Sequence, residues 1–255
     1  MILQDVLGPI HKPRKIAVCT AWGSPFSWTH AAYNMMNLIR PEGAEVKFLP
    51  GMGRDPARRH VWGVMKALAW GATHICFLGA DQLHDLDILV KFAKHCENGW
   101  PMVTALVPIR GWVRSEGVDK PFMKVAWKLK PEVETQSIRE LSMSAETLEM
   151  IDPSDGPYQK VAVVGSGAIM FDVDLLHNLK KPWFREADAD DDAWRPASMD
   201  TTFVWRMCQE AGGRFLCDQT INVAHLDVFP IDESYPERFN DWPKEKAEKT
   251  LYWDL

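Results

Sequence analysis

The chain has 255 residues, of which 46% are hydrophobic and 25% charged, and its formal net charge is −6 at pH 7. This length suits one large α/β domain or two small ones with a sizeable core. The negative balance argues against a surface that is basic throughout, although a local basic groove stays compatible with it. No stretch approaches the ~18 apolar residues of a membrane span, and the N-terminus has no signal-peptide pattern. These features predict a cytoplasmic protein without a membrane span.

The cysteine pattern indicates reduced thiols. The sequence contains five cysteines, an odd number, and no CxxC pair. Cys19, Cys76 and Cys208 lie in apolar or helical patterns, where cysteine behaves as a small hydrophobic residue. A disulfide framework is therefore not expected.

The first half of the chain alternates strand and helix. Apolar periodicity, β-branched runs and Gly/Pro boundaries predict the following elements. They are a strand at Lys15–Thr20, a helix at Ser27–Ile39, a strand at Glu45–Leu49, a loop at 50–56, a helix at Ala57–Trp70 capped by Gly71, a strand at His74–Leu78, a helix from Asp87 to about Cys96 and a strand at Met102–Pro108. Such alternation implies a parallel sheet with helices on both faces, and ligands bind such sheets beyond the carboxyl ends of the strands. Gly23-Ser24 and the stretch 79–85 fall at such ends.

The second half changes character. Residues 110–160 favour edge hairpins and a loop over the sheet. The elements predicted after them are a strand at Val161–Phe171 broken by Gly165-Ser166-Gly167, a short helix at Leu175–Leu179, an acidic loop at Arg185–Arg195, a helix at Asp200–Gly212, a strand at Phe215–Cys217 followed by INVAHLD, and a polar tail from Pro230.

Carboxylates follow the buried strand His74–Leu78. Asp81 stands where a carboxylate can coordinate Mg²⁺ or Mn²⁺ that bridges to a diphosphate; the alternative is a carboxylate that caps the next turn. His84 could add a ligand but is expected to lie in the loop, and Asp85 and Asp87 are expected to be caps.

Three further positions could contribute chemistry. His225 ends a strand-like run and would gain significance if it lay beside Asp81. Asp200 opens a helix, either as its N-cap or as a general base directed into the cleft. Arg58-Arg59 open a helix after a Gly-rich loop, where an arginine fork and helix amides suit a diphosphate. The Gly165-Ser166-Gly167 stretch allows a ligand to approach the backbone closely but is no dinucleotide fingerprint.

Three segments in a fixed order carry a family resemblance. They are ARRHVWGVMKALAWGATHICFLGAD, then VVGSGAIMFDVDLL with KPWF, then MDTTFVWRMCQEAGGRFLCDQTINVAHLD. The series resembles GT-A fold glycosyltransferases, most nearly the bacterial and phage enzymes of the large inverting family that uses nucleotide-diphosphate sugars. The resemblance covers roughly residues 15–228. It implies an α/β fold with a Rossmann-like, mostly parallel sheet flanked by helices and a smaller mixed sheet on the acceptor side.

The resemblance also implies how the chain is divided. A single GT-A-like domain over residues 1–255 would contain a nucleotide-sugar-binding half at about 15–108, an acceptor and catalytic half at about 109–228, and a C-terminal tail at 229–255.

Site residues follow from the family pattern. The family's Asp-x-Asp motif, which binds metal and donor diphosphate, reads Gly79-Ala80-Asp81 here, so that the first acid is absent and Asp81 keeps the place of the metal ligand. The family's late histidine metal ligand looks like His225, and its Glu-Asp pair resembles Met199-Asp200, with Asp200 as base. The remaining implied residues are Thr20, Ala21, Trp22 and Arg59 for the donor, and Gly165, Ser166, Gly167 and Trp183, within Pro182-Trp183-Phe184, lining donor and acceptor.

The expected function is therefore transfer of a sugar from a UDP- or GDP-linked donor to an acceptor hydroxyl. Mn²⁺ or Mg²⁺ held by Asp81 and His225, together with Arg59, would neutralise the leaving diphosphate. Asp200 would take the acceptor proton, with inversion at the anomeric carbon; if Asp200 only clamps the acceptor, a retaining route stays open. The loop 185–195 could fold over substrate. The acceptor is open among a protein, a glycan, a small molecule and a modified nucleic acid base.

Two alternatives compete with this function. A non-catalytic sugar- or nucleotide-binding module would explain the missing acids at Gly79 and Met199, because a fold can be kept after its chemistry is lost. A metal-dependent nucleotidyltransferase shares strand-end carboxylates, but such enzymes need a phosphate-cradling loop after the first strand. Here TAWGSPFSWTH has one glycine and no Lys or Arg.

Overall fold

The computed structural model describes residues 13–21, 29–53, 55–108, 112–115, 118–121, 126–134, 136–184, 198–211 and 215–226, and only the backbone of 112–115 and 118–121. Trp22, the loop 185–195 and the tail 229–255 lie outside the described residues.

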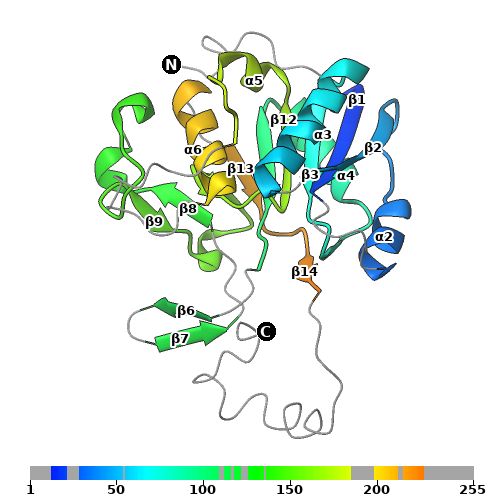
Figure 1. Cartoon of the computed structure of the whole chain (residues 1–255). Coiled ribbons are helices and arrows are strands. Elements are labelled where there is room, and N and C mark those ends of the chain that lie inside the picture. Colours follow the sequence, from blue (N-terminus) through cyan, green and yellow to red (C-terminus); the bar gives the residue numbers. More distant parts are fainter. Residues whose placement is uncertain are drawn as a thin grey trace, which may run out of the picture.

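A seven-stranded sheet forms the centre, in the order β10-β13-β5-β12-β3-β1-β2 (Figure 1). Its strands in chain order are β1 (Lys15–Ala21), β2 (Glu45–Gly51), β3 (His74–Leu78), β5 (Met102–Ala105), β10 (Tyr158–Val161), β12 (Ala168–Asp172) and β13 (Phe215–Asp218). The pairs β1–β2, β1–β3 and β5–β13 are parallel. β12 runs antiparallel between β3 and β5, and β10 runs antiparallel to β13. The predicted mostly parallel sheet is confirmed, and the two predicted halves of the chain share it.

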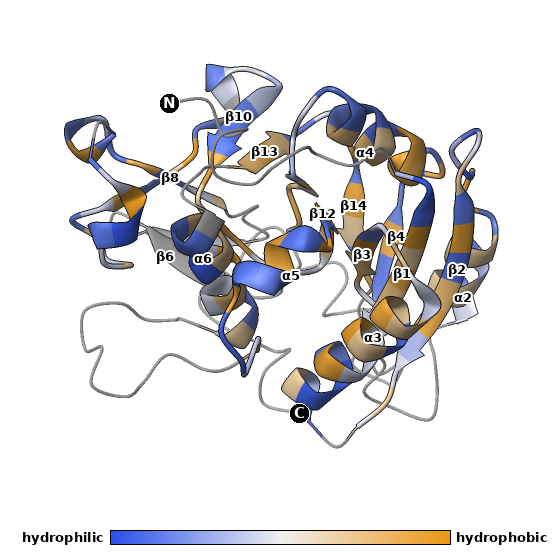
Figure 2. Cartoon of the chain, turned by 90° about the horizontal axis from the view of Figure 1, so that it is seen from above, coloured by the Kyte–Doolittle hydropathy of each residue, from blue (hydrophilic) through white to orange (hydrophobic). Residues whose placement is uncertain are grey.

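Helices cover both faces of this sheet, as the sequence predicts. They are α2 (Thr29–Met36), α3 (Pro56–Trp70), α4 (Ile88–Glu97), α5 (Asp174–Asn178) and α6 (Met199–Ala211). Neighbouring residues of one strand enter different clusters: Ile75 packs with α3, α5 and α6, whereas Cys76 packs with α2 and α4. Figure 2 shows α3 and α4 on opposite sides of the sheet. Because successive strand residues point to opposite faces, burial on both faces explains the continuous apolar run of β3.

The start and end of α3 follow from its sequence. Asp55 is the N-cap, and its Oδ1 accepts a hydrogen bond from Arg58 N at 2.8 Å. Pro56 occupies the first turn, where its missing N–H costs nothing. Gly71 ends the helix at φ 74°, a left-handed conformation that favours glycine, as predicted. A Cβ on Gly63 would lie 3.2 Å from the Cβ of Cys19, so this glycine allows α3 to pack closely on β1.

Three smaller sheets and three short helices complete the described chain. The strands are β4 (Gln82–His84) with β14 (Val223–His225), β6 (Trp112–Ser115) with β7 (Val118–Pro121), and β8 (Ala126–Leu129) with β9 (Leu148–Met150) and β11 (Val163–Val164). The 3₁₀ helices are η1 (Pro131–Val133), η2 (Ile138–Glu140) and η3 (Pro153–Asp155). The β6–β7 pair agrees with a hairpin predicted for residues 110–160, whereas β8 and β9 pair antiparallel across a long connection that contains η1 and η2. Gly165–Gly167 does interrupt strand structure, between β11 and β12.

Several local predictions are wrong. The prediction that His84 lies in a loop fails because β4 pairs with β14, a partner far along the chain. Asp87 is the N-cap residue of α4, as predicted, but its side chain makes no cap hydrogen bond, and Asp85 is not the N-cap residue. Both carboxylates instead form ion pairs with Lys91 Nζ, at 3.2 and 2.9 Å. The second strand continues to Gly51, whereas β5 ends at Ala105, before Pro108.

The cysteine side chains lie in the interior of the protein. All five cysteines are buried and unpaired with one another, in agreement with the sequence. Burial raises the pKa of the Cys19 thiol to about 12. Within the described ranges, none of the helices combines the length and the apolar character that crossing a membrane requires.

Candidate functional site

The candidate site lies at the carboxyl end of β3. The chain leaves β3 through Gly79-Ala80-Asp81 and enters β4, which pairs with β14 so that Gln82 lies opposite His225. Leu226 N donates to the carbonyl oxygen of Asp81 at 2.7 Å. This pairing brings Asp81 Oδ1 to 3.9 Å from His225 Nε2, with the two side chains 36% and 20% exposed. The structure thus unites the two residues that the resemblance implies as metal ligands.

Gln82 is the first residue of β4 and was not predicted from the sequence to belong to the site. Its side chain is buried, with 3% of the residue exposed. Its Nε2 lies 2.9 Å from His225 Nε2, and its Oε1 lies 3.2 Å from His84 Nε2. The other ring nitrogen of His225 contacts the carbonyl oxygen of Pro108. Burial lowers the pKa of His84 to about 4, so the His84 ring is neutral near pH 7.

The glycines of two predicted segments are required by the Gln82 side chain. Gly79 N donates to Gly167 O at 2.8 Å, which holds the two segments together. A Cβ at Gly79 would lie 2.4 Å from Gln82 Cδ, and one at Gly167 would lie 2.5 Å from Gln82 Nε2. A Cβ at position 79 would therefore require the Gln82 side chain to shift, and the neutral amide of Gln82 fills the space beside Gly79.

Asp200 stands on the other side of the same glycine-containing segment. The antiparallel course of β12 puts Ala168 beside Leu78, so Gly165–Gly167 lies at the edge where β3 ends. Asp200 is in the first turn of α6, and its Oδ2 accepts a hydrogen bond from Ser166 N at 3.1 Å. Its Oδ1 accepts one from the Ser198 hydroxyl. The predicted base is therefore fixed by hydrogen bonds to both of its oxygens.

His60 is a second residue that sequence reasoning missed. It lies on the buried face of α3 and is 9% exposed. Its Nδ1 lies 2.9 Å from Pro56 O and its Nε2 lies 3.3 Å from Ser166 Oγ. Burial lowers the pKa of His60, so the ring is neutral near pH 7. Because a carbonyl only accepts, the hydrogen is on Nδ1 and the Ser166 hydroxyl donates to Nε2.

The implied donor residues lie at the carboxyl ends of β1 and β2. Thr20 is 5% exposed and Ala21 is half-buried, opposite Gly51. Arg59 Nε donates to Gly53 O at 3.0 Å, which holds its guanidinium beside the loop after β2. Thr20 borders an apolar cavity of about 150 Å³. The other lining residues are Ala32, Met35, Met36, Phe48 and Pro50.

Trp183 lies in the core. It is 6% exposed, and the Lys181 ammonium lies 4.8 Å from its ring centroid. Its neighbour Phe184 stacks on Phe203 with centroids 4.2 Å apart. Trp183 belongs to the core cluster that also contains residues of α6, and its implied contact with donor or acceptor stays a prediction.

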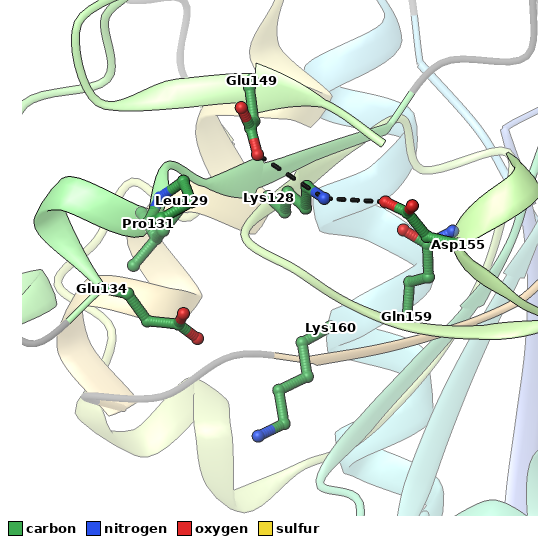
Figure 3. Close-up of a pocket in the computed structure, with 8 residues that line it drawn as sticks. All are labelled: Lys128, Leu129, Pro131, Glu134, Glu149, Asp155, Gln159 and Lys160. Carbon is green, nitrogen blue, oxygen red and sulfur yellow. Dashed lines mark hydrogen bonds and ion pairs between the residues drawn. The ribbon is translucent and has the colours of Figure 1, made fainter. Parts of the chain in front are cut away.

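A larger cavity of about 250 Å³ lies among β8, β9 and β10 (Figure 3). Its lining residues are Lys128, Leu129, Pro131, Glu134, Glu149, Asp155, Gln159 and Lys160. Lys128 Nζ lies 2.9 Å from Asp155 Oδ2 and 3.5 Å from Glu149 Oε1, so its charge is already paired. None of the residues implied by the resemblance lines this cavity.

The Asp81 carboxylate and the His225 imidazole fit a divalent cation whose other ligands are water and substrate phosphates. The described residues contain no group of three or more His, Cys, Asp or Glu that could hold a metal ion. One carboxylate and one imidazole 3.9 Å apart can both bind an ion at about 2.1 Å, and Mg²⁺-like ions take their other ligands from water and substrate phosphates. The residues present therefore fit a metal that binds together with a diphosphate.

Comparisons with known proteins concern the fold. No protein-family model matches the chain, and no curated protein sequence matches it. Among solved structures, the chain is similar to A197 from STIV, with 13% identity, a TM-score of 0.49 and coverage of 84% of this chain and 86% of that one. It is also similar to GalNAc-T7, crystallised with UDP, GalNAc and Mn²⁺, with 10% identity, a TM-score of 0.48 and coverage of 86% and 44%. A third is TarS of S. aureus, with 11% identity, a TM-score of 0.47 and coverage of 85% and 37%.

The chain spans less than half of the GalNAc-T7 and TarS chains, and all three TM-scores lie below 0.5. Its own elements give the architecture: a mixed α/β fold with a seven-stranded, mostly parallel sheet, helices on both faces and smaller antiparallel sheets.

Proposed function

We propose that the chain is a glycosyltransferase that moves a sugar from a nucleotide-diphosphate sugar to an acceptor hydroxyl. The observation that carries the proposal is the meeting of Asp81 and His225 at 3.9 Å, at the carboxyl edge of the sheet. Ligands bind α/β sheets at this edge. Asp200 contacts the backbone of Ser166, one residue before the glycine that bonds to Gly79. A pair suited to a metal and a carboxylate suited to a base therefore flank one segment.

The nucleoside would bind at the ends of β1 and β2. The cavity beside Thr20 is apolar and about 150 Å³ in volume. Small-molecule sites are usually concave and apolar with a few polar groups that orient the ligand. The flat face of a base suits Phe48 and Pro50, and the Thr20 backbone and hydroxyl could supply the polar contacts. Arg59, held beside Gly53, would reach the diphosphate.

The diphosphate would lie between Arg59 and the Asp81–His225 pair. These two residues would hold Mn²⁺ or Mg²⁺, which when bound neutralises charge on a departing diphosphate. Since the described residues supply one carboxylate beside His225, metal and donor are expected to bind together.

Asp200 would act as the general base. Its carboxylate takes the proton of the acceptor hydroxyl as the acceptor oxygen forms a bond to the anomeric carbon. The bond from that carbon to the diphosphate oxygen breaks at the same time, and its electron pair leaves with the nucleoside diphosphate. Attack from the face opposite the leaving group inverts the anomeric carbon. The fixed orientation of Asp200 by Ser166 and Ser198 supports this role, because an effective base must be held in place.

A non-catalytic binding module is the second candidate. The observation that favours it is Gln82, which closes the space beside Gly79 where the family has a carboxylate. Such a module would bind donor without turnover, which distinguishes it from an enzyme.

The test is a panel of UDP-, GDP- and other nucleotide-sugars, assayed for release of nucleoside diphosphate with Mn²⁺ and with EDTA. We expect that nucleoside diphosphate is released from one of these donors, and that this release requires Mn²⁺. Calorimetry on the same panel covers the case in which hydrolysis needs acceptor. Binding of a donor without release, even with candidate acceptors, would favour the binding module, and absence of any donor binding would overturn both candidates.

A further inference from the structure

Gln82 lies buried at the centre of the candidate site. It is 3% exposed, and its amide fills the space in which a Cβ on Gly79 or Gly167 would lie. A buried glutamine in this position costs free energy unless its amide is fully hydrogen-bonded. Both ends of the amide do have partners, on two different histidines.

The hydrogen bonds of His225 fix its tautomer. The Pro108 carbonyl only accepts, so His225 Nδ1 carries a hydrogen. The His225 Nε2 then bears a lone pair, and Gln82 Nε2 donates to it at 2.9 Å. On the other side, His84 Nε2 donates to Gln82 Oε1 at 3.2 Å. The chain of donors and acceptors is consistent from His84 to Pro108.

The His225 lone pair that accepts from Gln82 is also the one that faces Asp81. The distance of 3.9 Å between Asp81 Oδ1 and His225 is measured to this same Nε2. A nitrogen lone pair cannot accept a hydrogen bond and bind a cation together. We propose that Gln82 occupies the metal-binding nitrogen of His225 in the free protein, so that a cation must displace the amide before it binds. This inference rests on the proposed metal site and names the residue that regulates it.

The effect on metal affinity is modest in size and definite in sign. A net hydrogen bond in a folded protein corresponds to about a two- to tenfold change in an equilibrium constant. Removing the amide should therefore strengthen binding of Mn²⁺ to the protein without donor by about this factor. A residue that served as a ligand itself would give the opposite sign.

The experiment is Mn²⁺ titration of the full chain without donor, with free Mn²⁺ measured by electron paramagnetic resonance. The variant Gln82→Leu keeps most of the volume and loses the donor group. We expect it to bind Mn²⁺ about two- to tenfold more tightly than the wild type, and the double variant with His225→Ala to lose the gain. The matched control is Gln159→Leu, because Gln159 is also buried, at 7% exposed, but bonds to Asp152 O. This control should bind Mn²⁺ as the wild type does.

A second measurement uses the wild type alone and does not depend on the variant folding. The ring ¹⁵N shifts of His225 at neutral pH without metal should show a neutral ring with the hydrogen on Nδ1. An imidazolium, or a hydrogen on Nε2, would overturn the proposal, as would unchanged or weaker Mn²⁺ binding by Gln82→Leu. Neither measurement uses a sugar donor, so a silent donor panel would overturn the proposed function and leave the result on Gln82 standing.

Discussion

The two sides of the candidate site are held in different ways. On the base side, Asp200 accepts from the backbone of Ser166, whose hydroxyl donates to the buried ring of His60. On the metal side, Asp81 Oδ1 lies 3.9 Å from His225 Nε2. The side-chain amide of Gln82 is hydrogen-bonded to the same nitrogen of His225. The backbone N–H of Ser166, which holds Asp200, cannot rotate away. The side-chain amide of Gln82, which bonds to His225, can rotate about its side-chain bonds.

This difference indicates which side is ready before ligands arrive. Groups that act in a transition state gain from being fixed in advance, which fits Asp200. A site for an ion that enters with its substrate gains from ligands that can move, which fits His225 and Gln82. Substitutions at the site and a change of pH test this contrast between the two sides.

Asp200→Asn should lower nucleoside diphosphate release in the presence of acceptor by about 10³-fold, since a general base contributes 10²–10⁴-fold. The amide keeps the shape of the carboxylate and can still accept from Ser166 N, so donor affinity should stay within about twofold. Turnover is measured by nucleotide release and affinity by calorimetry. Unchanged turnover would remove Asp200 from the mechanism.

Acidification should destabilise the metal side through His84. The ordinary histidine pKa of 6.5 applies to the unfolded chain, and burial lowers the pKa in the folded chain to about 4. Between these values only the unfolded chain takes up the proton, so the stabilisation present above pH 6.5 is lost as the pH falls toward 4. The loss is roughly 3 kcal/mol.

Urea unfolding of the wild type and of His84→Gln at pH 7, 5.5 and 4.5 measures this effect. Glutamine can still donate near Gln82 and does not titrate. The variant should therefore show a weaker fall in unfolding free energy over this range. Parallel pH profiles for the two proteins would show that His84 does not protonate on unfolding.

Asp81→Ala should weaken donor binding with Mn²⁺ by about a hundredfold, because the ion loses its only carboxylate from the described residues of this edge. With EDTA the two proteins should bind donor equally weakly. Asp87→Ala is the matched control, since Asp87 forms an ion pair with Lys91 away from the site. Identical calorimetry of Asp81→Ala and wild type with Mn²⁺ would contradict the metal assignment.

Ser166→Ala should lower the free energy of unfolding by about 1–2 kcal/mol, because His60 Nε2 loses its buried donor. The backbone N–H of Ser166 remains, so the hydrogen bond that positions Asp200 stays in place. Ser154→Ala is the control, because its hydroxyl bonds to Asp152 at an exposed position, where surface changes cost at most about 0.5 kcal/mol. Equal effects of the two substitutions in urea would show that the His60 contact adds nothing to stability.

Local patterns predicted most of the elements. The boundaries of β3 agree with the prediction, and Gly71 ends α3 as expected, because apolar runs and glycine act over a few residues. β4 was missed because three residues of mixed polarity form a strand only through pairing with β14. Asp85 and Asp87 show the same limit, since the position of Lys91 decided their partners.

For the candidate site, the resemblance implied Asp81 and His225 as metal ligands. The fold brings their side chains to 3.9 Å from each other, and their role as ligands stays a prediction. His60 and Gln82 carried no signal of their own, because their partners Ser166 and His225 lie 106 and 143 residues away. The role of a buried polar residue in a site becomes clear only when its hydrogen-bond partner is known, and a single sequence does not show which distant residue that partner is.

The buried cysteines can serve as natural labels for the local unfolding of different parts of the protein. Cys19, Cys76, Cys96, Cys208 and Cys217 lie on β1, β3, α4, α6 and β13 and are all buried. Thiol reagents attack the exposed thiolate, so each cysteine reacts only after its own layer has opened. The rates at which the five are labelled would report the sequence in which helices on the two faces separate from the sheet, in the unmodified protein.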